Sequence, residues 1–383
     1  MRRRTLSVLA AVLILAACAC ATSQTGSVGT QSHPTPVGGV ATAPPSPLPT
    51  PSTEGPYFGV LVDLLTTPLI YYANVVDING RLWAAMKLTK RIAISTQKGQ
   101  AVELPYVTTS LTKLYMLDGD STVLSLHLGD GNQATATHLA VGANMEAAFA
   151  VSPDDSQIAV SVLDFNRTPV HVTLYTETLS GANHRVIYES DSNYVWPVAW
   201  HSGLLVLAHA YGPYEEDIAK AAPGRDNPYS AVSYHIVDPT NANRVYLLGA
   251  CTVSGALSPA GSGCIQGGTI DWQGNVSPPW STSDWGSVSS AASLSPDGRW
   301  IAATVPADPG KMGIWTRDGR VITWVYGAGT RDWAGWLDDE HVLTGSYLNP
   351  TFQSTATNPI RGGIDHPVIG HGFFAARLPT NIV

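Results

Sequence analysis

The sequence has few charged residues for its length. Asp, Glu, Lys and Arg together make up 13% of the 383 residues, which is about half the fraction usual in globular domains. The net charge of −8 argues against a nucleic-acid surface, because such a surface needs clustered Lys and Arg against the phosphates. We therefore expect no nucleic-acid partner and few long, charged helices.

The common catalytic and metal-binding motifs are missing as well. The sequence contains no Gly-x-Ser-x-Gly elbow, no His-Glu-x-x-His helix and no Walker loop. Its four cysteines form no Cys-x-x-Cys pair and no Cys/His group at zinc spacing. A nucleophile, a base and an orienting group cannot be assembled from sequence neighbours, which weakens the case for an enzyme. We expect no cofactor.

Residues 1–17 have the pattern of a signal peptide. Arg2, Arg3 and Arg4 form a basic start, and an apolar stretch follows at 6–15, broken only by Ser7. This stretch is too short to cross a bilayer as a mature helix, so we expect it to direct export. Removing it with its three arginines would change the net charge from −8 to −11.

The signal peptide ends in Leu15-Ala16-Ala17-Cys18, which resembles the bacterial lipobox. The resemblance implies that Cys18 becomes the lipidated first residue and attaches the protein to the cell membrane on its extracytoplasmic side. Two or more acyl chains give stable anchoring, whereas one chain gives only marginal binding. The alternative is an ordinary signal peptide, cut after Ala17, Ala19 or Ala21, in which Cys18 has no role.

Residues 18–55 have the composition of a tether. They are mostly Thr, Ser, Gly, Pro and Ala, with almost no charge, and they end in a proline-rich stretch at 43–51. Such a segment cannot bury enough apolar surface to fold, and it remains a partly extended chain. We expect it to separate a globular domain, residues 56–383, from the membrane.

The domain 56–383 consists of short apolar runs separated by turn signals, with almost no helical period. Asn-Gly and Asp-Gly pairs, which favour tight hairpin turns, lie at 79–80, 118–119, 130–131, 297–298 and 318–319. The clearest unit, 147–191, holds four expected strands, and the unit 290–327 repeats it. The pattern predicts an all-β domain of antiparallel sheets.

Four strands repeated at roughly 40 to 50 residues are typical of the blades of a β-propeller. We predict seven four-stranded antiparallel blades, with six as the alternative. The last unit looks incomplete, and we expect the strand at 373–378 to pair with the first strand of the domain, near 60–64. Such pairing would close the ring and remove exposed sheet edges.

One turn phrase occurs twice, as Ser152-Pro153-Asp154-Asp155 and as Ser295-Pro296-Asp297-Gly298. Pro presets the backbone for a turn, and Asp can accept hydrogen bonds from the amides that follow it. Both copies resemble the Ser-Pro-Asp-Gly phrase of the WD-like repeats in TolB-type propellers of bacterial envelopes. The resemblance implies the fold and not a function. Nothing in the chain resembles the separate N-terminal α/β domain of TolB, which puts a translocation role in doubt.

Two groups of residues are candidates for covalent or metal chemistry. Cys251 and Cys264 flank a short loop rich in Gly and Pro, and we expect a disulfide between them in an oxidising compartment; two free buried thiols are the alternative. Asp365, His366 and His371 lie in a glycine-rich loop. A carboxylate and two imidazoles could hold a metal ion with an open position for water, although their spacing matches no common zinc pattern.

Aromatic residues offer a third kind of site. Most of the eleven tryptophans should pack between blades. Trp280 and Trp285 fall in an expected loop, where they could stack on a sugar or grip an apolar side chain of a partner.

Taken together, these features predict a lipid-anchored, non-catalytic propeller that acts as a monomer and binds a protein, a peptide or a glycan. The alternative is an extracytoplasmic hydrolase of lactonase or glycosidase type, with acids or a metal at the mouth of its channel.

Overall fold

The computed structural model describes residues 57–63, 69–90, 95–96, 99–100, 107–210, 212, 231, 233–251, 253–264, 268–277, 292–305, 308–326, 332–346, 353–363, 365–380 and 382. The predicted signal peptide, the predicted tether and Cys18 lie outside these ranges. Every regular element in the described residues is a β-strand. These residues contain no helix that is long and apolar enough to span a membrane.

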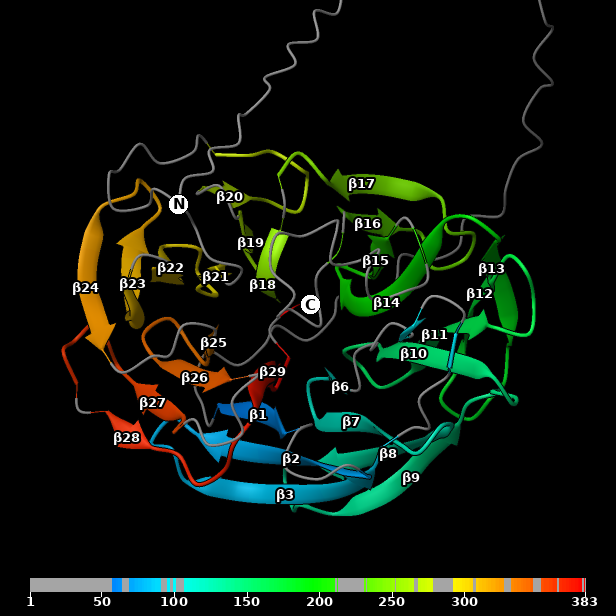
Figure 1. Ribbon diagram of the computed structural model, residues 1–383, viewed down its shortest axis with the longest axis horizontal. Helices are drawn as coiled ribbons and strands as arrows, with labels where there is room; N and C mark the ends of the chain where they lie inside the picture. The colour runs from blue at the N-terminus through cyan, green and yellow to red at the C-terminus, as the bar shows by residue number, and fades with distance from the viewer. Residues whose placement is uncertain are drawn as a thin grey trace, which may run out of the picture. The chain divides into compact units, whose positions relative to one another are not determined.

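Apart from one two-stranded hairpin, the strands form seven sheets, here called blades 1 to 7, arranged around a centre (Figure 1). Blade 1 contains β29 (Phe373–Leu378), β1 (Phe58–Asp63), β2 (Ile70–Asp77) and β3 (Leu82–Thr89). Blade 2 contains β6 (Val107–Thr109), β7 (Lys113–Asp118), β8 (Thr122–His127) and β9 (Gln133–His138). Blade 3 contains β10 (Met145–Val151), β11 (Gln157–Asp164), β12 (His171–Thr178) and β13 (Arg185–Ser190).

The order from the centre outward is the same in the remaining blades. Blade 4 contains β14 (Tyr194–His201), β15 (Leu204–Ala210), β16 (Ser233–Val237) and β17 (Arg244–Leu248). Blade 5 contains β18 (Val253–Ser258), β19 (Gly261–Cys264) and β20 (Thr269–Ile270), followed by a bridge between Ile270 and Val276. Blade 6 contains β21 (Ala292–Leu294), β22 (Trp300–Val305), β23 (Asp308–Thr316) and β24 (Val321–Tyr326). Blade 7 contains β25 (Asp332–Trp336), β26 (Val342–Ser346), β27 (Thr355–Thr357) and β28 (His366–Pro367).

This arrangement is a seven-bladed β-propeller, as predicted, and the alternative of six blades is wrong. Neighbouring strands within each blade pair antiparallel. A separate two-stranded hairpin, β4 (Ser95–Thr96) with β5 (Gly99–Gln100), lies between blades 1 and 2 in the sequence.

The ring closes between the two ends of the domain. β29 pairs antiparallel with β1, so that Phe58 lies opposite Leu378 and Val62 opposite Phe373. The predicted closure is confirmed, but the expectation of an incomplete last unit is wrong. Blade 7 has its own four strands, and β29 completes blade 1 instead. The two outer strands of blade 7 are only three and two residues long. They lie in a loop-like stretch of sequence, so they could not be recognised as strands from the sequence.

The repeated turn phrase has one set of hydrogen bonds in both copies. In blade 6, the Ser295 hydroxyl accepts a bond from the amide of Trp300 and donates to Asp297, which accepts from the amide of Arg299. In blade 3, Ser152, Asp154, Ser156 and Gln157 form the same bonds. Each turn joins the inner strand of its blade to the next strand, and the shared bonds explain why the phrase recurs.

The core consists of side chains packed within and between neighbouring blades. Five tryptophans are at least 95% buried: Trp196, Trp200, Trp272, Trp315 and Trp336. One apolar cluster combines residues of blades 3, 4 and 5, and another combines blades 6 and 7. The expectation that tryptophans pack between blades is therefore confirmed for Trp196 and Trp336, which lie in these clusters.

The predicted disulfide is present in blade 5. Cys251 lies just before β18, and Cys264 is the last residue of β19, directly opposite Val253. The disulfide therefore links the start of β18, the inner strand of blade 5, to the end of β19. It supports a blade that has only three strands among its described residues.

Candidate functional site

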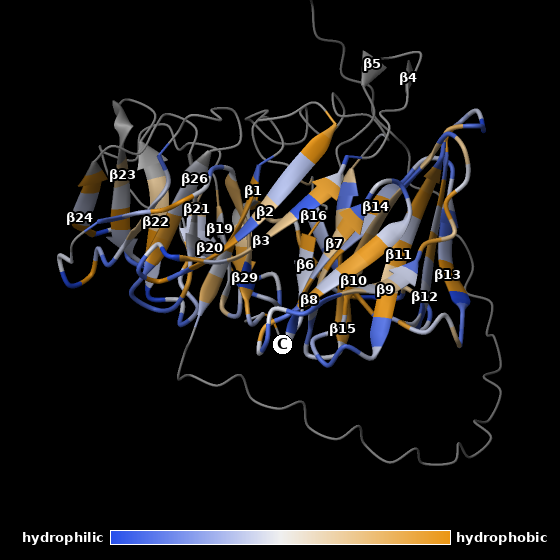
Figure 2. Ribbon diagram, turned by 90° about the horizontal axis from the view of Figure 1, so that it is seen from below, coloured by the Kyte–Doolittle hydropathy of each residue, from blue (hydrophilic) through white to orange (hydrophobic). Residues whose placement is uncertain are grey.

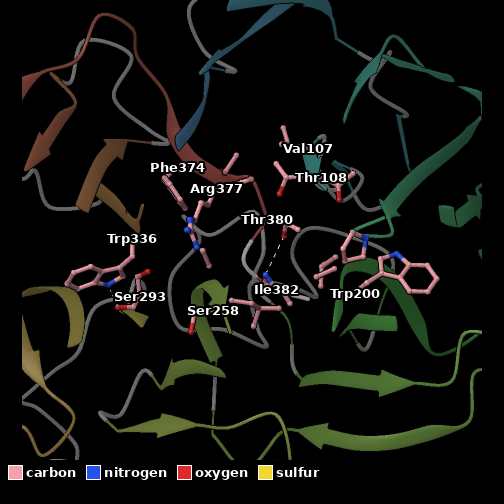
Figure 3. A pocket seen from close by; sticks show the side chains of 18 of the residues that line it. Val107, Thr108, Trp200, Ser258, Ser293, Trp336, Phe374, Arg377, Thr380 and Ile382 are labelled. Atoms are coloured by element: carbon pink, nitrogen blue, oxygen red, sulfur yellow. Dashed lines mark hydrogen bonds between the residues drawn. The ribbon is translucent and has the colours of Figure 1, made fainter. Parts of the chain in front are cut away.

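A small cavity lies in the central channel and is lined by the inner strands of all seven blades. Its volume is about 100 Å³, and Figure 3 shows the side chains around it. One lining residue from each inner strand shows the arrangement: Thr108 (β6), Val151 (β10), Ala199 (β14), Leu257 (β18), Leu294 (β21), Trp336 (β25) and Ala376 (β29). Because every blade contributes, the cavity belongs to the ring as a whole.

The cavity lies toward one mouth of the channel. Many of its lining residues are at the ends of inner strands, including Val151, Ser258 and Leu294. The residues that follow β29 reach the same mouth, which Figure 2 places at the face carrying the C-terminus. The Thr380 amide donates to the Ser110 carbonyl at 2.8 Å, and both Thr380 and Ile382 line the cavity. The last described residues therefore form part of the site.

Two tryptophans hold the inner strands together around the cavity. The Trp200 indole nitrogen donates to the Ala150 carbonyl of the preceding blade at 3.2 Å. The Trp336 indole nitrogen donates in the same way to the Ser293 carbonyl at 2.9 Å. These donors are already used within the protein, and both rings are directed away from the cavity, between the blades (Figure 3).

Arg377 is the one cation among the described lining residues. Its guanidinium carbon lies 4.1 Å from the centre of the Tyr57 ring, and Figure 3 shows its side chain among those facing the channel. The Arg377 Nε atom is buried and has no hydrogen-bond partner among the described residues. Burial lowers the pKa of Arg377, against the opposing influence of Tyr57, Asp338 and Asp339.

None of the described residues lining the cavity is Asp, Glu, His or Cys. Its hydroxyl groups, such as those of Ser258 and Ser293, therefore have no lining histidine or carboxylate to act as a general base. Among the described lining residues there is also no pair of carboxylates of the kind that glycoside hydrolysis generally requires. In its described part, this cavity can bind and orient a ligand, but it has no acid–base pair.

A second pocket, of about 390 Å³, lies between blades 3 and 4. His209 on β15 and His235 on β16 face it with their rings stacked at 5.0 Å. Burial lowers the pKa of His209, and it lowers that of His235 to about 4, with further contributions from the charges of His209 and Arg244. Burial therefore favours the neutral form of both rings, and they were not singled out in the sequence because they lie 26 residues apart.

The structure does not bring Asp365, His366 and His371 together as a metal site. In the described part of the chain, no three His, Cys, Asp or Glu side chains are grouped closely enough to hold a metal ion. The His366 side chain is exposed on β28, the outermost strand of blade 7. His371 lies beside blade 1 instead, where its carbonyl accepts a 3.4 Å hydrogen bond from Asn74.

The remaining predicted binding residues, Trp280 and Trp285, lie outside the described residues. Sequence reasoning missed Arg377. The only available signal was a single arginine within the apolar strand 373–378, which shows neither its position at the channel nor its contact with Tyr57.

No protein-family model and no curated protein matches this chain. Among solved structures, apo AztD from Citrobacter koseri is 12% identical with a TM-score of 0.45, and the match covers 84% of this chain and 98% of that chain. The propeller domain of Cps50 (Swd1) from Myceliophteria thermophila is 10% identical with a TM-score of 0.44, covering 75% of this chain and 93% of that chain. Similarity of this degree assigns no family, and the propeller assignment rests on the strand pairing of this chain itself.

Proposed function

We propose that this chain is a membrane-anchored, extracytoplasmic lipoprotein whose propeller is a non-catalytic binding module for a protein, a peptide or a glycan. The amino-terminal pattern supports the anchor, because a basic start, a short apolar stretch and Cys18 follow one another in lipobox order. The segment 18–55, which has almost no charge, would hold the propeller away from the membrane. The Cys251–Cys264 disulfide fits an oxidising compartment outside the cytoplasm.

The chemistry of the channel is the observation on which the binding role rests. The cavity is lined by all seven blades, yet its described lining holds no carboxylate, imidazole or thiol. A hydrolase would need such groups beside its substrate. The same lining offers hydroxyls, aromatic rings and one guanidinium, which are suited to recognition. We propose that the protein acts as a monomer, without nucleic acid.

The anchor is tested by comparing Cys18→Ala with Cys20→Ala in a bacterial host. We expect Cys18→Ala to lose labelled fatty acid and to move from the membrane fraction to the periplasm or the medium. Cys20→Ala is the matched control, because it removes a neighbouring thiol and leaves the lipobox intact, so it should remain labelled and membrane-bound. If Cys18→Ala stays in the membrane and still takes up label, the lipoprotein assignment is wrong.

A further inference from the structure

We propose that the channel cavity binds a small carboxylate, with Arg377 as the group that recognises it. The inference goes beyond the proposed function, since a small carboxylate is a further ligand besides a protein, a peptide or a glycan. It also assigns a role to a charged residue whose buried Nε atom has no acceptor among the described residues.

Arg377 is a partly buried cation at the channel, and in the described part of the chain one of its nitrogens lacks an acceptor. A charge inside a protein is costly unless it is paired and hydrogen-bonded. Among the described residues, the buried Nε atom of Arg377 has no acceptor, while the rest of the side chain is hydrogen-bonded to Tyr57 and lies in the field of Asp338 and Asp339. The lowered pKa of its guanidinium has burial as its main cause. An anion in the cavity would supply an acceptor and a counter-charge within the channel itself.

The two carboxylates whose charges act on Arg377 are already engaged in other bonds. Asp338 and Asp339 influence Arg377 through their charge, but each has other hydrogen-bond donors. Asp338 accepts bonds from the ring of His341 at 2.8 Å and from the amide of Glu340 at 2.8 Å. Asp339 accepts a 2.9 Å bond from the amide of Asp297 in the neighbouring blade. These bonds hold both carboxylates in the turn of blade 7.

The Tyr57 ring positions the guanidinium for recognition. Stacking at 4.1 Å covers one face of the planar cation and restricts its rotation. Arginine binds carboxylates through two parallel hydrogen bonds, which are stronger and more specific than bonds between neutral groups. A guanidinium held in one plane loses less freedom when a carboxylate binds, and this favours a carboxylate over a ligand without a planar acceptor pair.

The size and walls of the cavity limit the rest of the ligand. A cavity of about 150 Å³ lined by apolar groups is known to hold benzene, so one of about 100 Å³ has room for a carboxylate on a short hydrocarbon chain. Val107, Val151 and Phe374 supply apolar lining. We therefore assign a short-chain monocarboxylate, with propionate as the probe.

The test uses the full-length protein with propionate and, as a neutral analogue of nearly the same shape, propionamide. We expect propionate to raise the thermal unfolding midpoint in a saturable way at constant ionic strength, and to change the tryptophan fluorescence, since Trp200 and Trp336 line the cavity. Propionamide should do neither. Equal effects of the two compounds, or no effect of propionate, would overturn the proposal without any variant being needed.

Variants then locate the site. Arg377→Gln should weaken propionate binding by about tenfold or more, because hydrogen bonds to a charged group are lost, and Arg377→Lys should bind with intermediate strength. Arg81→Gln, at an exposed turn residue, is the matched control and should bind like the wild type. Unchanged binding by Arg377→Gln would place the ligand elsewhere. Cys18→Ala should bind propionate like the wild type. The test of the lipid anchor and the test of the ligand site therefore have independent outcomes.

Discussion

Single tryptophan side chains connect neighbouring blades at the channel. Trp200 and Trp196 both lie on β14, and both are almost fully buried. Only Trp200 has a hydrogen bond for its indole nitrogen, to the carbonyl of Ala150 on blade 3. The Trp196 nitrogen has no partner among the described residues. Comparing substitutions of the two residues therefore separates the contribution of an inter-blade hydrogen bond to stability from the contribution of apolar packing.

We predict that Trp200→Phe destabilises the protein more than Trp196→Phe. Both changes remove similar apolar volume, but Trp200→Phe also leaves the Ala150 carbonyl without its donor, which costs about 1 kcal/mol or more. Trp196→Phe removes a buried donor that has no described acceptor, which offsets part of its packing loss. Urea unfolding followed by circular dichroism measures both free energies. An equal or larger loss for Trp196→Phe would show that the hydrogen bond contributes nothing.

At this scale, the sequence predicts residues whose role depends on near neighbours. The bonds of Ser152 and Ser295 reach only to the fifth residue beyond them, so the phrase itself identifies the turn. Arg377 is different, because Tyr57 lies at the other end of the domain and meets it only when the ring closes. A site whose residues meet only when the ring closes has no local sequence pattern by which it could be predicted.

Among the elements, the turn between the first two strands of a blade depends on one buried hydroxyl. Ser295 is fully buried, and its oxygen is the acceptor for the amide of Trp300 at 3.0 Å. The same hydroxyl donates to Asp297 at 2.7 Å. Without the Ser295 hydroxyl, the amide of Trp300 at the start of β22 would lose this acceptor.

We predict that Ser295→Ala lowers the free energy of unfolding by about 1–3 kcal/mol, the cost of leaving a buried donor unsatisfied. Ser295→Thr keeps the hydroxyl and should recover most of the loss. Ser192→Ala, at an exposed turn position, is the control and should change stability by less than about 0.5 kcal/mol. If Ser295→Ala matches Ser192→Ala in urea unfolding, the hydroxyl does not hold the turn.

The elements that escaped prediction are short. β27 and β28 have three and two residues, too few to show the alternation of apolar and polar residues that marks a strand. They form because β26 of the same blade offers an unpaired edge, so their structure comes from tertiary pairing. Strands with seven or eight residues, such as β10 and β11, carry their own pattern and agree with the expected runs.

For the whole molecule, stability depends on the closure of the ring by β29. All six residues of β1 are buried, which requires a neighbour on each of its edges. β29 supplies the inner one and contributes Phe373, Phe374 and Leu378 to the core cluster that spans blades 1, 2, 3 and 7. The Phe374 ring fits against Gly335 of blade 7, where a Cβ atom would lie only 2.0 Å from it. Closure therefore joins the last blade to the first by packing as well as by pairing.

We predict that a chain ending at Gly372 loses its cooperative unfolding transition. Burying each of the three large side chains of β29 contributes about 1.5–3 kcal/mol, and their sum approaches the 5–15 kcal/mol that stabilises a typical domain. The exposed edge of β1 should also promote association.

A chain ending at Thr380 keeps β29 and its bond to Ser110, so it should unfold nearly as the full chain does. Adding a peptide of residues 373–383 to the shorter chain should restore the transition and the monomer in gel filtration, because the missing strand can pair with β1 from outside. A chain ending at Gly372 that unfolds cooperatively at the full-length midpoint would show that the ring does not need its closing strand.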